Sequence, residues 1–344
     1  TYRKQSFVNE NTITYDKIFN EKHNLNLLGG GSYSSYKFDF QRVRSTGGFA
    51  TDFITTLNGA NDINVGSTTT TETKRILMSY FGRAQYSFDN RYLFTASIRR
   101  DGSSNFGKDT KWGTFPSASI GWKVSSESFM ANQDVISDLK FRGSWGLAGN
   151  NGVGDYASIA TLGFSNYSLG GNTASGQVPA NSANADLSWE TAETYDIGLD
   201  LGLFNNRIFA SFDYYTKTNS DLLLNVPVPR ASGFGAAITN IGEVENKGWE
   251  LELTTRNLQG KFDWTTDFNL SHNENVVKKL GPDNSPIYGG AFDIQHNVLM
   301  VGEPMYTLFL VQREGILSQE DIDNGAALLG NQTAGDHKYV DFDG

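Results

Sequence analysis

The sequence of 344 residues contains no cysteine, which excludes disulfides, thiolate metal sites and cysteine nucleophiles. It also lacks any run of about 18 apolar residues, so a transmembrane helix is not expected. The formal net charge is −10 and Lys and Arg form no cluster, which argues against nucleic-acid binding, because phosphate contacts require grouped cations. The histidines are scattered, so no zinc or acid–base site is predicted: His23, His272, His296 and His337. Since no nucleophile–base cluster is present, we predict that the chain is not an enzyme.

What the sequence does contain is a strict alternation of apolar and polar residues. Residues 261–273 read KFDWTTDFNLSHN, with polar side chains at every odd position and mostly apolar ones at the even positions. Successive side chains of a strand point to opposite faces, so this pattern predicts a strand with one apolar and one polar face. A transmembrane strand needs only about 9–11 residues, and half of them are hidden from a hydropathy window. The same pattern recurs at 91–99, 139–147, 194–204, 207–217 and 248–255.

The connections between the predicted strands alternate between short and long. Ten strands are predicted at 11–19, 24–34, 74–88, 91–100, 114–124, 138–147, 187–203, 207–219, 244–256 and 261–274. Links after the odd-numbered strands are short, and those after the even-numbered strands are long, at 35–73, 101–113, 148–186, 220–243 and from 275 onward. Short turns on one side and long loops on the other are typical of outer-membrane barrels, with the turns in the periplasm. We therefore predict an all-β fold, a transmembrane antiparallel up-and-down β-barrel.

The predicted barrel is incomplete. In lipid every backbone N–H and C=O must pair inside the protein, so ten strands require further strands to close the sheet. The sequence starts at Thr1 without a signal peptide and stops in an acidic turn, and we interpret it as an internal piece of a longer polypeptide. Residues 1–274 are interpreted as barrel wall and 275–344 as an extracellular loop region. Within the latter, 302–313 forms either one further strand or part of a loop.

Several blocks of the sequence resemble one family. LFTASIRRDGSSNFGKDTKWGTFPSASIGWKVSSESFM (93–130) is similar to the barrel core of SusC/RagA-type TonB-dependent outer-membrane transporters. The other similar blocks are LKFRGSWGLAGNNGVGDY (139–156), WETAETYDIGLDLGLFNNRIFASFDYYTKTNSDLLL (189–224), NIGEVENKGWELEL (240–253) and residues 302–316. They occur in the order and spacing of the family and together cover most of 75–316.

The resemblance implies a larger barrel, of about 22 strands, with an N-terminal plug domain in the outer membrane of a Gram-negative bacterium. It implies import of oligosaccharides or peptides, driven through TonB, with a SusD-type surface lipoprotein as a lid and outer-membrane lipid around the apolar faces. The TonB-contacting segment, the plug and the closing strands are expected outside this sequence. Two alternatives stay open: a soluble glycan-binding or adhesin β-sandwich, and a siderophore-type TonB-dependent receptor.

Charged residues on the polar strand faces are the candidates for a lumen lining. They form either a conduit that holds the plug and passes a hydrated substrate, or only a solvated wall whose cross-strand ion pairs contribute a few tenths of a kcal/mol each. The candidates are Arg83, Arg99, Lys123, Lys140, Arg142, Asp196, Asp200, Asp213, Lys217, Glu250, Glu252, Asp263 and Asp267.

Loop aromatics are the candidates for substrate contact, because aromatic faces stack on sugar rings or peptide side chains. They are Tyr156, Phe164, Tyr167, Phe234 and Tyr288, and their alternative role is to pack loops together or to contact the lid. At the end of the sequence, Asp341 and Asp343 resemble the start of a calcium loop. No cofactor is otherwise expected.

Overall fold

The computed structural model describes residues 1–340 except 50, 52, 54, 55, 65, 66, 290–295, 327 and 329. The chain forms two compact units, Thr1–Glu274 and Asn275–Gly344, and each is described by itself. Among the described residues, none of the helices has the length and apolar character needed to cross a bilayer.

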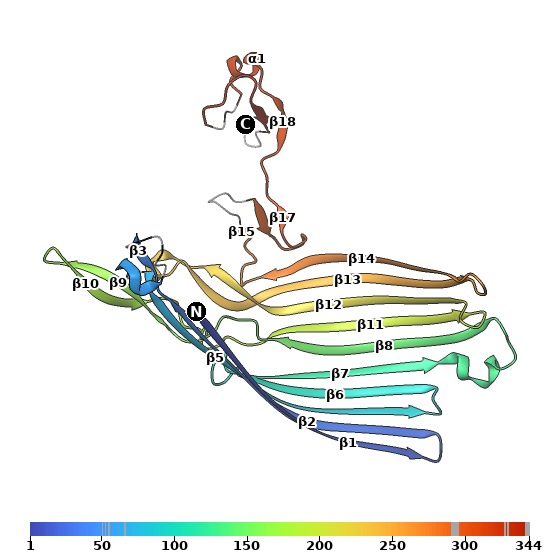
Figure 1. The fold of residues 1–344 in the computed structure, drawn as a ribbon. Coiled ribbons are helices and arrows are strands. Elements are labelled where there is room, and N and C mark those ends of the chain that lie inside the picture. The colour runs from blue at the N-terminus through green and yellow to red at the C-terminus, as the bar shows by residue number, and fades with distance from the viewer. Residues whose placement is uncertain are drawn as a thin grey trace. The chain divides into compact units, whose positions relative to one another are not determined.

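The first unit is built on a ten-stranded antiparallel sheet, in which every strand pairs with the next wall strand along the chain (Figure 1). This confirms the predicted up-and-down order of ten strands. The wall strands are β1 (Tyr2–Phe19), β2 (His23–Arg42), β5 (Thr69–Phe88), β6 (Tyr92–Ser103), β7 (Trp112–Lys123), β8 (Ile136–Asn150), β11 (Glu190–Leu203), β12 (Ile208–Pro227), β13 (Ala236–Leu258) and β14 (Trp264–Leu280).

Several strands extend further toward the long loops than the sequence pattern predicted. β1 begins at Tyr2 rather than at residue 11, β2 continues to Arg42, and β5 begins at Thr69. The predicted loops 35–73 and 220–243 are therefore wrong over much of their length. Alternation marks only the part of a strand that has an apolar neighbour on one side, whereas backbone pairing continues where both faces are polar. Residues 69–73, TTTET, show this, because β-branched threonine favours the strand without any alternation.

β12 and β13 form the longest hairpin of the wall, and an irregularity interrupts it. Their register shifts between Asn219 and Leu222 and again before Leu223, and Asp221 adopts a positive φ of 56°. Asn240 donates from Nδ2 to the Asp221 carbonyl at 2.8 Å and to the Ser188 carbonyl at 2.9 Å. This amide links the bulged strand to the segment that enters β11.

The opposite ends of the strands are joined by short turns that need left-handed backbone. Asp89 and Asn90, between β5 and β6, have φ of 52° and 54°. Two consecutive positive φ values are the signature of a tight hairpin turn, and Asn and Asp tolerate them best among non-glycine residues. The β13–β14 turn continues to Asp263, whose Oδ1 accepts from the Gly260 N–H at 2.9 Å. β14 therefore begins at Trp264, three residues later than predicted.

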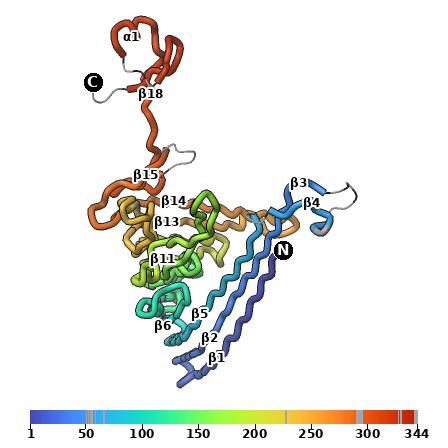
Figure 2. The backbone as a smooth tube through the Cα atoms, turned by 90° about the vertical axis from the view of Figure 1, so that its left-hand side faces the viewer, coloured from blue at the N-terminus to red at the C-terminus, as the bar shows by residue number. Residues whose placement is uncertain are grey.

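Two small hairpins and short 3-10 turns complete the first unit. Figure 2 shows the hairpin of β3 and β4 projecting from the loop end of β2 and β5. The remaining elements are β3 (Ser45–Phe49), β4 (Ala60–Ile63), β9 (Leu162–Leu169), β10 (Asn172–Pro179), η1 (Leu57–Gly59), η3 (Val124–Ser126), η4 (Ser128–Met130) and η5 (Arg230–Ser232).

The second unit consists of short elements. They are β15 (Ile287–Gly289), β16 (Asn297–Leu299), β17 (Thr307–Leu308), β18 (Arg313–Ile316), α1 (Gln319–Asp323) and β19 (His337–Tyr339). Ser318 and Asp321 form a capping box at the start of α1. The Lys338 ammonium, 2.7 Å from Asp321 Oδ1, holds the pKa of that carboxyl well below its usual range. In 302–313 the described strand β17 has only two residues, too few to span a bilayer.

Candidate functional site

The two faces of the ten-stranded sheet differ in chemistry. One face carries large hydrophobic side chains that remain exposed, among them Ile98, Ile120, Ile197, Phe212 and Leu270. A soluble sheet would bury such a face against a second layer, so this exposure indicates an apolar neighbour outside the chain. The other face carries the charged residues that alternate with these positions.

An ion cluster on this polar face is centred on Arg142 of β8. Its Nε lies 3.0 Å from Asp200 Oδ2 and its Nη2 2.9 Å from Asp200 Oδ1. Its Nη1 lies 2.9 Å from Asp213 Oδ1, so one guanidinium contacts carboxylates of both β11 and β12. Ser211 accepts a hydrogen bond from Arg142 at 3.1 Å and donates one to Asp200 at 2.9 Å. Lys140 Nζ lies 3.6 Å from Asp200 Oδ2.

The strand register explains how these residues meet. Lys140 lies directly opposite Asp200, and Arg142 lies opposite Gly198. A Cβ atom at Gly198 would stand 2.6 Å from Arg142 Cζ and also too close to Asp213 Oδ1. The absence of a side chain at Gly198 therefore leaves the space in which the guanidinium crosses β11 to reach β12. The alternation pattern predicted the charged members of this cluster but not the roles of Gly198 and Ser211.

The other predicted acidic residues lie next to this cluster or further along β14. Glu250 is opposite Asp213 and Glu252 is opposite Ser211 in the β12–β13 pair. Asp267 accepts a hydrogen bond from Thr254 at 2.7 Å. Asp196 lies on β11 opposite Tyr215. Asp263, predicted in the wall, lies in the β13–β14 turn.

The predicted basic residues outside the cluster are distributed along the same face. Arg99 forms a second group, with Nε 2.8 Å from Asp101 Oδ1 and Nη2 2.8 Å from Ser79 Oγ. Its guanidinium lies over the Phe81 ring, 5.5 Å from the centroid. The strand pairings place Arg83 opposite Ser97, Lys123 opposite Lys140, and Lys217 opposite Thr194. The structure thus gathers Lys140, Arg142, Asp200 and Asp213. Lys123 lies beside Lys140 across the β7–β8 pair, and Arg83, Arg99 and Lys217 lie apart from the cluster.

At the loop end of the sheet, a small apolar core orders the long loops. It contains Phe106, Phe115, Val153, Leu187 and Trp189. The Trp189 ring lies 5.3 Å from both Phe106 and Phe115, and its Nε1 donates to the Lys111 carbonyl at 3.0 Å. The buried Asn105 amide donates to the Val153 carbonyl at 3.2 Å. The sequence did not reveal this core, because Phe106 and Val153 are single apolar residues in loops and carry no periodic signal. Phe115, Leu187 and Trp189 fall in the predicted strands 114–124 and 187–203, whose alternation does not show which loop residues they meet.

The five predicted substrate aromatics do not form one site. Phe164 is 86% exposed and shares β9 with the half-exposed Tyr167. Tyr156 adopts a φ of 64°, and its hydroxyl accepts from the Lys74 N–H at 3.2 Å, so it fixes a loop to β5. Phe234 lies in the loop between β12 and β13. Tyr288 belongs to the second unit and packs against Phe309, with 4.9 Å between the ring centroids.

At the short-turn end, Glu127 holds the β7–β8 connection in place. It accepts from the Tyr92 hydroxyl at 2.7 Å, the Trp122 Nε1 at 3.0 Å and the Arg91 Nη1 at 2.8 Å. The hydrogen bond from Tyr92, together with those from Trp122 and Arg91, lowers the pKa of the Glu127 carboxyl. Arg91 also pairs with Asp89 of the β5–β6 turn.

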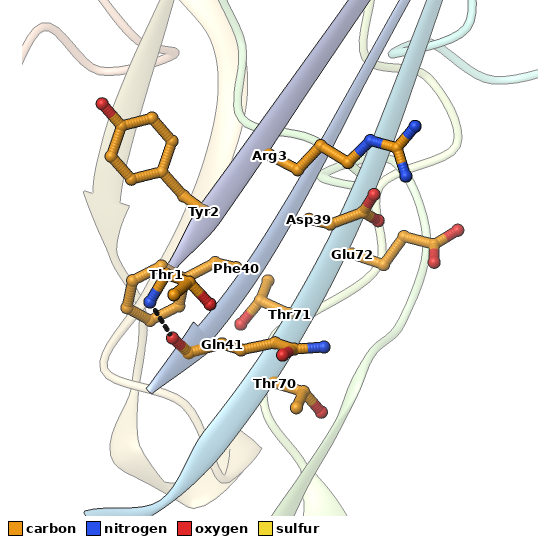
Figure 3. Close-up of a pocket in the computed structure, with 9 residues that line it drawn as sticks. All are labelled: Thr1, Tyr2, Arg3, Asp39, Phe40, Gln41, Thr70, Thr71 and Glu72. Atoms are coloured by element: carbon orange, nitrogen blue, oxygen red, sulfur yellow. Dashed lines mark hydrogen bonds between the residues drawn. The ribbon is translucent and has the colours of Figure 1, made fainter. Parts of the chain in front are cut away.

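A hollow of about 630 Å³ lies at the long-loop side of the sheet, where β1 and β5 begin and β2 ends. Figure 3 shows Arg3, Asp39 and Glu72 pointing to one side of the strands and Tyr2 to the other. The Thr1 amine donates to the Gln41 carbonyl at 2.8 Å beside it. None of the predicted substrate residues lines this hollow.

No metal site is evident in the described part of the chain, where no three His, Cys, Asp or Glu side chains come together to hold an ion. The predicted calcium residues Asp341 and Asp343 lie outside the described residues.

An up-and-down antiparallel sheet with one exposed apolar face, one charged face, short turns and long ordered loops is the wall of an outer-membrane β-barrel. The chain belongs to the TonB-dependent receptor family. The family described as TonB dependent receptor-like, beta-barrel matches residues 1–296.

Individual relatives support the same assignment. The chain is 40% identical over 285 residues to the TonB-dependent receptor P39 of Formosa agariphila, covering 83% of the chain and 27% of that receptor. It is 39% identical over 241 residues to the TonB-dependent receptor SusC of Bacteroides thetaiotaomicron, covering 68% of the chain and 24% of SusC. The structure of the RagAB peptide transporter matches with a TM-score of 0.83 and 27% identity, over 99% of this chain and 38% of that one.

The chain spans about a quarter to a third of the length of the curated relatives it matches. The predicted SusC/RagA-type resemblance, the barrel fold and the outer-membrane location in a Gram-negative bacterium are confirmed. The family consists of receptors and transporters rather than enzymes. The soluble β-sandwich alternative is thereby excluded. The siderophore receptor PiuA from Acinetobacter baumannii, at 13% identity and a TM-score of 0.51, shares only the fold.

Proposed function

We propose that the chain is part of a TonB-dependent importer of oligosaccharides or peptides that works with a SusD-type surface lipoprotein. The observation that carries this proposal is the match to the RagAB peptide transporter, which extends over 99% of the chain. The 39% identity to SusC supports the same class of transporter.

Within this proposal, the charged face of the sheet lines the lumen and the apolar face meets lipid. Guanidinium and carboxylate groups lose much of their hydration free energy in hydrocarbon, so they belong on the water-filled side of a barrel. The Arg142 cluster then acts first as a brace, because it cross-links β8, β11 and β12 on that side. The remaining acidic residues beside it, Glu250 and Glu252, give this part of the lumen a negative character.

The long loops of the first unit form the substrate entrance in this arrangement. The apolar core around Trp189 provides a fixed base, so exposed groups above it can contact ligand without reordering the loops. Phe164 and Tyr167 suit this role best, since both are exposed on the β9–β10 hairpin. Tyr156 suits it least, because its hydroxyl already accepts a backbone hydrogen bond.

The proposal is tested on the full-length protein that contains this chain. We would purify it from outer membranes in detergent and identify co-purifying proteins and bound small molecules by mass spectrometry. A co-purifying surface lipoprotein and a bound oligosaccharide or peptide are expected, and the ligand assigns the substrate class. A purified protein with no lipoprotein, carrying an iron–siderophore complex, would overturn the proposal.

The proposed contact of Phe164 with substrate is tested separately, once the bound ligand has been identified. Phe164→Ala is expected to weaken ligand binding about tenfold, the scale of one lost stacking contact. Phe129→Ala, at an exposed position in the β7–β8 turn, serves as the matched control and should leave affinity unchanged. Equal affinities for Phe164→Ala and the unmodified protein would remove Phe164 from the binding site.

A further inference from the structure

Two neighbouring arginines of β6 point to opposite faces of the sheet and have different surroundings. Arg99, on the polar face, is neutralised by Asp101 and hydrogen-bonded to Ser79. Arg100, on the apolar face, is exposed. Within the described part of the chain, no carboxylate forms an ion pair with Arg100. An uncompensated cation therefore stands on the face that meets lipid.

Aromatic rings form a platform around Arg100. Its guanidinium lies 5.6 Å from the centroid of the Trp112 ring, in cation–π geometry. The Tyr80 ring of β5 stacks against the Trp112 ring, with 6.1 Å between the ring centroids and 22° between the ring planes. A Cβ at Gly102 would stand 2.9 Å from three atoms of the Trp112 ring, so the missing side chain lets the indole lie flat against β6. Three strands thus hold Arg100, Trp112 and Tyr80 in one patch.

The patch lies at the outer margin of the apolar band. Along β6, Tyr92 stands at the short-turn end, and Arg100 follows about 27 Å further along, at about 3.4 Å per residue. With a strand tilt of about 40°, this path covers roughly 20 Å of height, close to the full band of about 25 Å. A cation is strongly disfavoured at the midplane of a bilayer but tolerated near its interface. With Tyr92 at the inner edge of the band, Arg100 lies in its outermost part, where a long cationic side chain extends to the lipid headgroups on the loop side.

We propose that this patch, Tyr80, Arg100 and Trp112, binds the phosphorylated sugar headgroup of a glycolipid in the outer leaflet. Arg100 supplies a planar cation with free N–H donors, which matches a phosphate oxygen pair. Trp112 and Tyr80 supply flat faces at the interface, suited to the adjoining sugar ring. The inference depends on the orientation of the sheet in the membrane and not on the imported substrate.

The test uses the full-length protein in mild detergent, titrated with diphosphorylated lipid A and monitored by native mass spectrometry. Arg100→Gln is expected to weaken binding of this lipid about fivefold, the contribution of one cation near an anionic headgroup. Arg100→Lys keeps the charge but loses the planar fork, and is expected to give an intermediate affinity. Inorganic phosphate in excess should not displace the lipid, which separates a lipid site from a free-phosphate site.

Lys217→Gln is the matched control, because it removes one exposed cation from the polar face of β12. It should bind lipid A like the unmodified protein. Equal lipid binding by Arg100→Gln, by Arg100→Lys and by the unmodified protein would overturn the proposal. The proposal would also be overturned if the unmodified protein bound dephosphorylated lipid A as tightly as diphosphorylated lipid A. Should Arg100→Gln fail to fold, the Arg100→Lys titration alone decides between these outcomes.

Discussion

At the residue scale, Arg142 decides how three strands of the wall are held together. Its guanidinium makes paired contacts with Asp200 and further contacts with Asp213 and Ser211. Because all of these groups are only partly exposed, their interaction is stronger than that of fully solvated ion pairs. Removing Arg142 leaves Asp213 without its cation and Asp200 with Lys140 alone.

Arg142→Met is therefore expected to lower the free energy of unfolding by about 1–3 kcal/mol, since Asp213 loses its cation and Asp200 keeps only Lys140. The measurement is urea unfolding of the full-length protein in lipid vesicles. Combining Arg142→Met with Asp200→Asn and Asp213→Asn should restore much of the loss. If Arg142→Met unfolds at the same urea concentration as the unmodified protein, the cluster does not brace the wall.

Gly198 offers a second test at the same place. Gly198→Ala is expected to weaken the Arg142–Asp213 contact and lower stability, because its Cβ would stand 2.6 Å from Arg142 Cζ. Gly143→Ala is the matched control, opposite Ile197 in the same strand pair, where the new Cβ meets nothing closer than 3.6 Å. The same unfolding assay compares both variants. Equal effects of the two substitutions would show that the space at Gly198 is not required.

The sequence predicted which charged residues share a face, because strand alternation follows directly from backbone geometry. It did not predict that Arg142 lies opposite Gly198, since register depends on the turns and on strand pairing across 58 residues to Asp200. Ser211 and Gly198 were missed for the same reason. Neither residue type has a chemical signal of its own in a strand.

At the element scale, one carboxylate ties the turn between β7 and β8 to the neighbouring strand and turn. Glu127 accepts hydrogen bonds from two strands and the neighbouring turn, and these donors lower its pKa. Since the pKa is lower in the folded than in the unfolded state, this stabilisation is complete above the unfolded value. The stabilisation is lost as the pH falls through the lower pKa that Glu127 has in the folded state.

We expect amide protection of residues 124–130 to be constant above pH about 5 and to fall below pH about 4, as Glu127 takes up a proton. Hydrogen exchange of the full-length protein, corrected for intrinsic rates, measures this. Glu127→Gln should show low protection at all pH values and no transition. A transition of the same size in Glu127→Gln would assign it to another group.

Strand ends were predicted less well than strand centres. Alternation identified the middle of β6 and β8, but not the continuation of β2 to Arg42 or of β12 to Pro227. Outside the apolar band both faces of a strand are polar, so periodicity stops while hydrogen bonding continues. The core around Trp189 escaped prediction because its members come from four separate places along the chain: Phe106 after β6, Phe115 within β7, Val153 after β8, and Leu187 and Trp189 just before β11.

At the scale of the whole wall, the orientation of the sheet in the membrane fixes which side chains meet lipid. Every second residue of a strand should face lipid and the residues between them should face water. β6 offers a clear series, with Phe94, Ala96 and Ile98 on the apolar face and Thr95 and Ser97 between them. Because the sequence has no cysteine, single labels can be placed at each position.

The most direct test is spin labelling of these five positions in the full-length protein, with other cysteines removed, reconstituted in lipid vesicles. Electron paramagnetic resonance would measure how readily lipid-soluble oxygen and a water-soluble nickel chelate reach each label. We expect oxygen access at positions 94, 96 and 98 and nickel access at positions 95 and 97. Nickel access at all five positions, or the reverse alternation, would contradict the assignment of the charged face to the lumen.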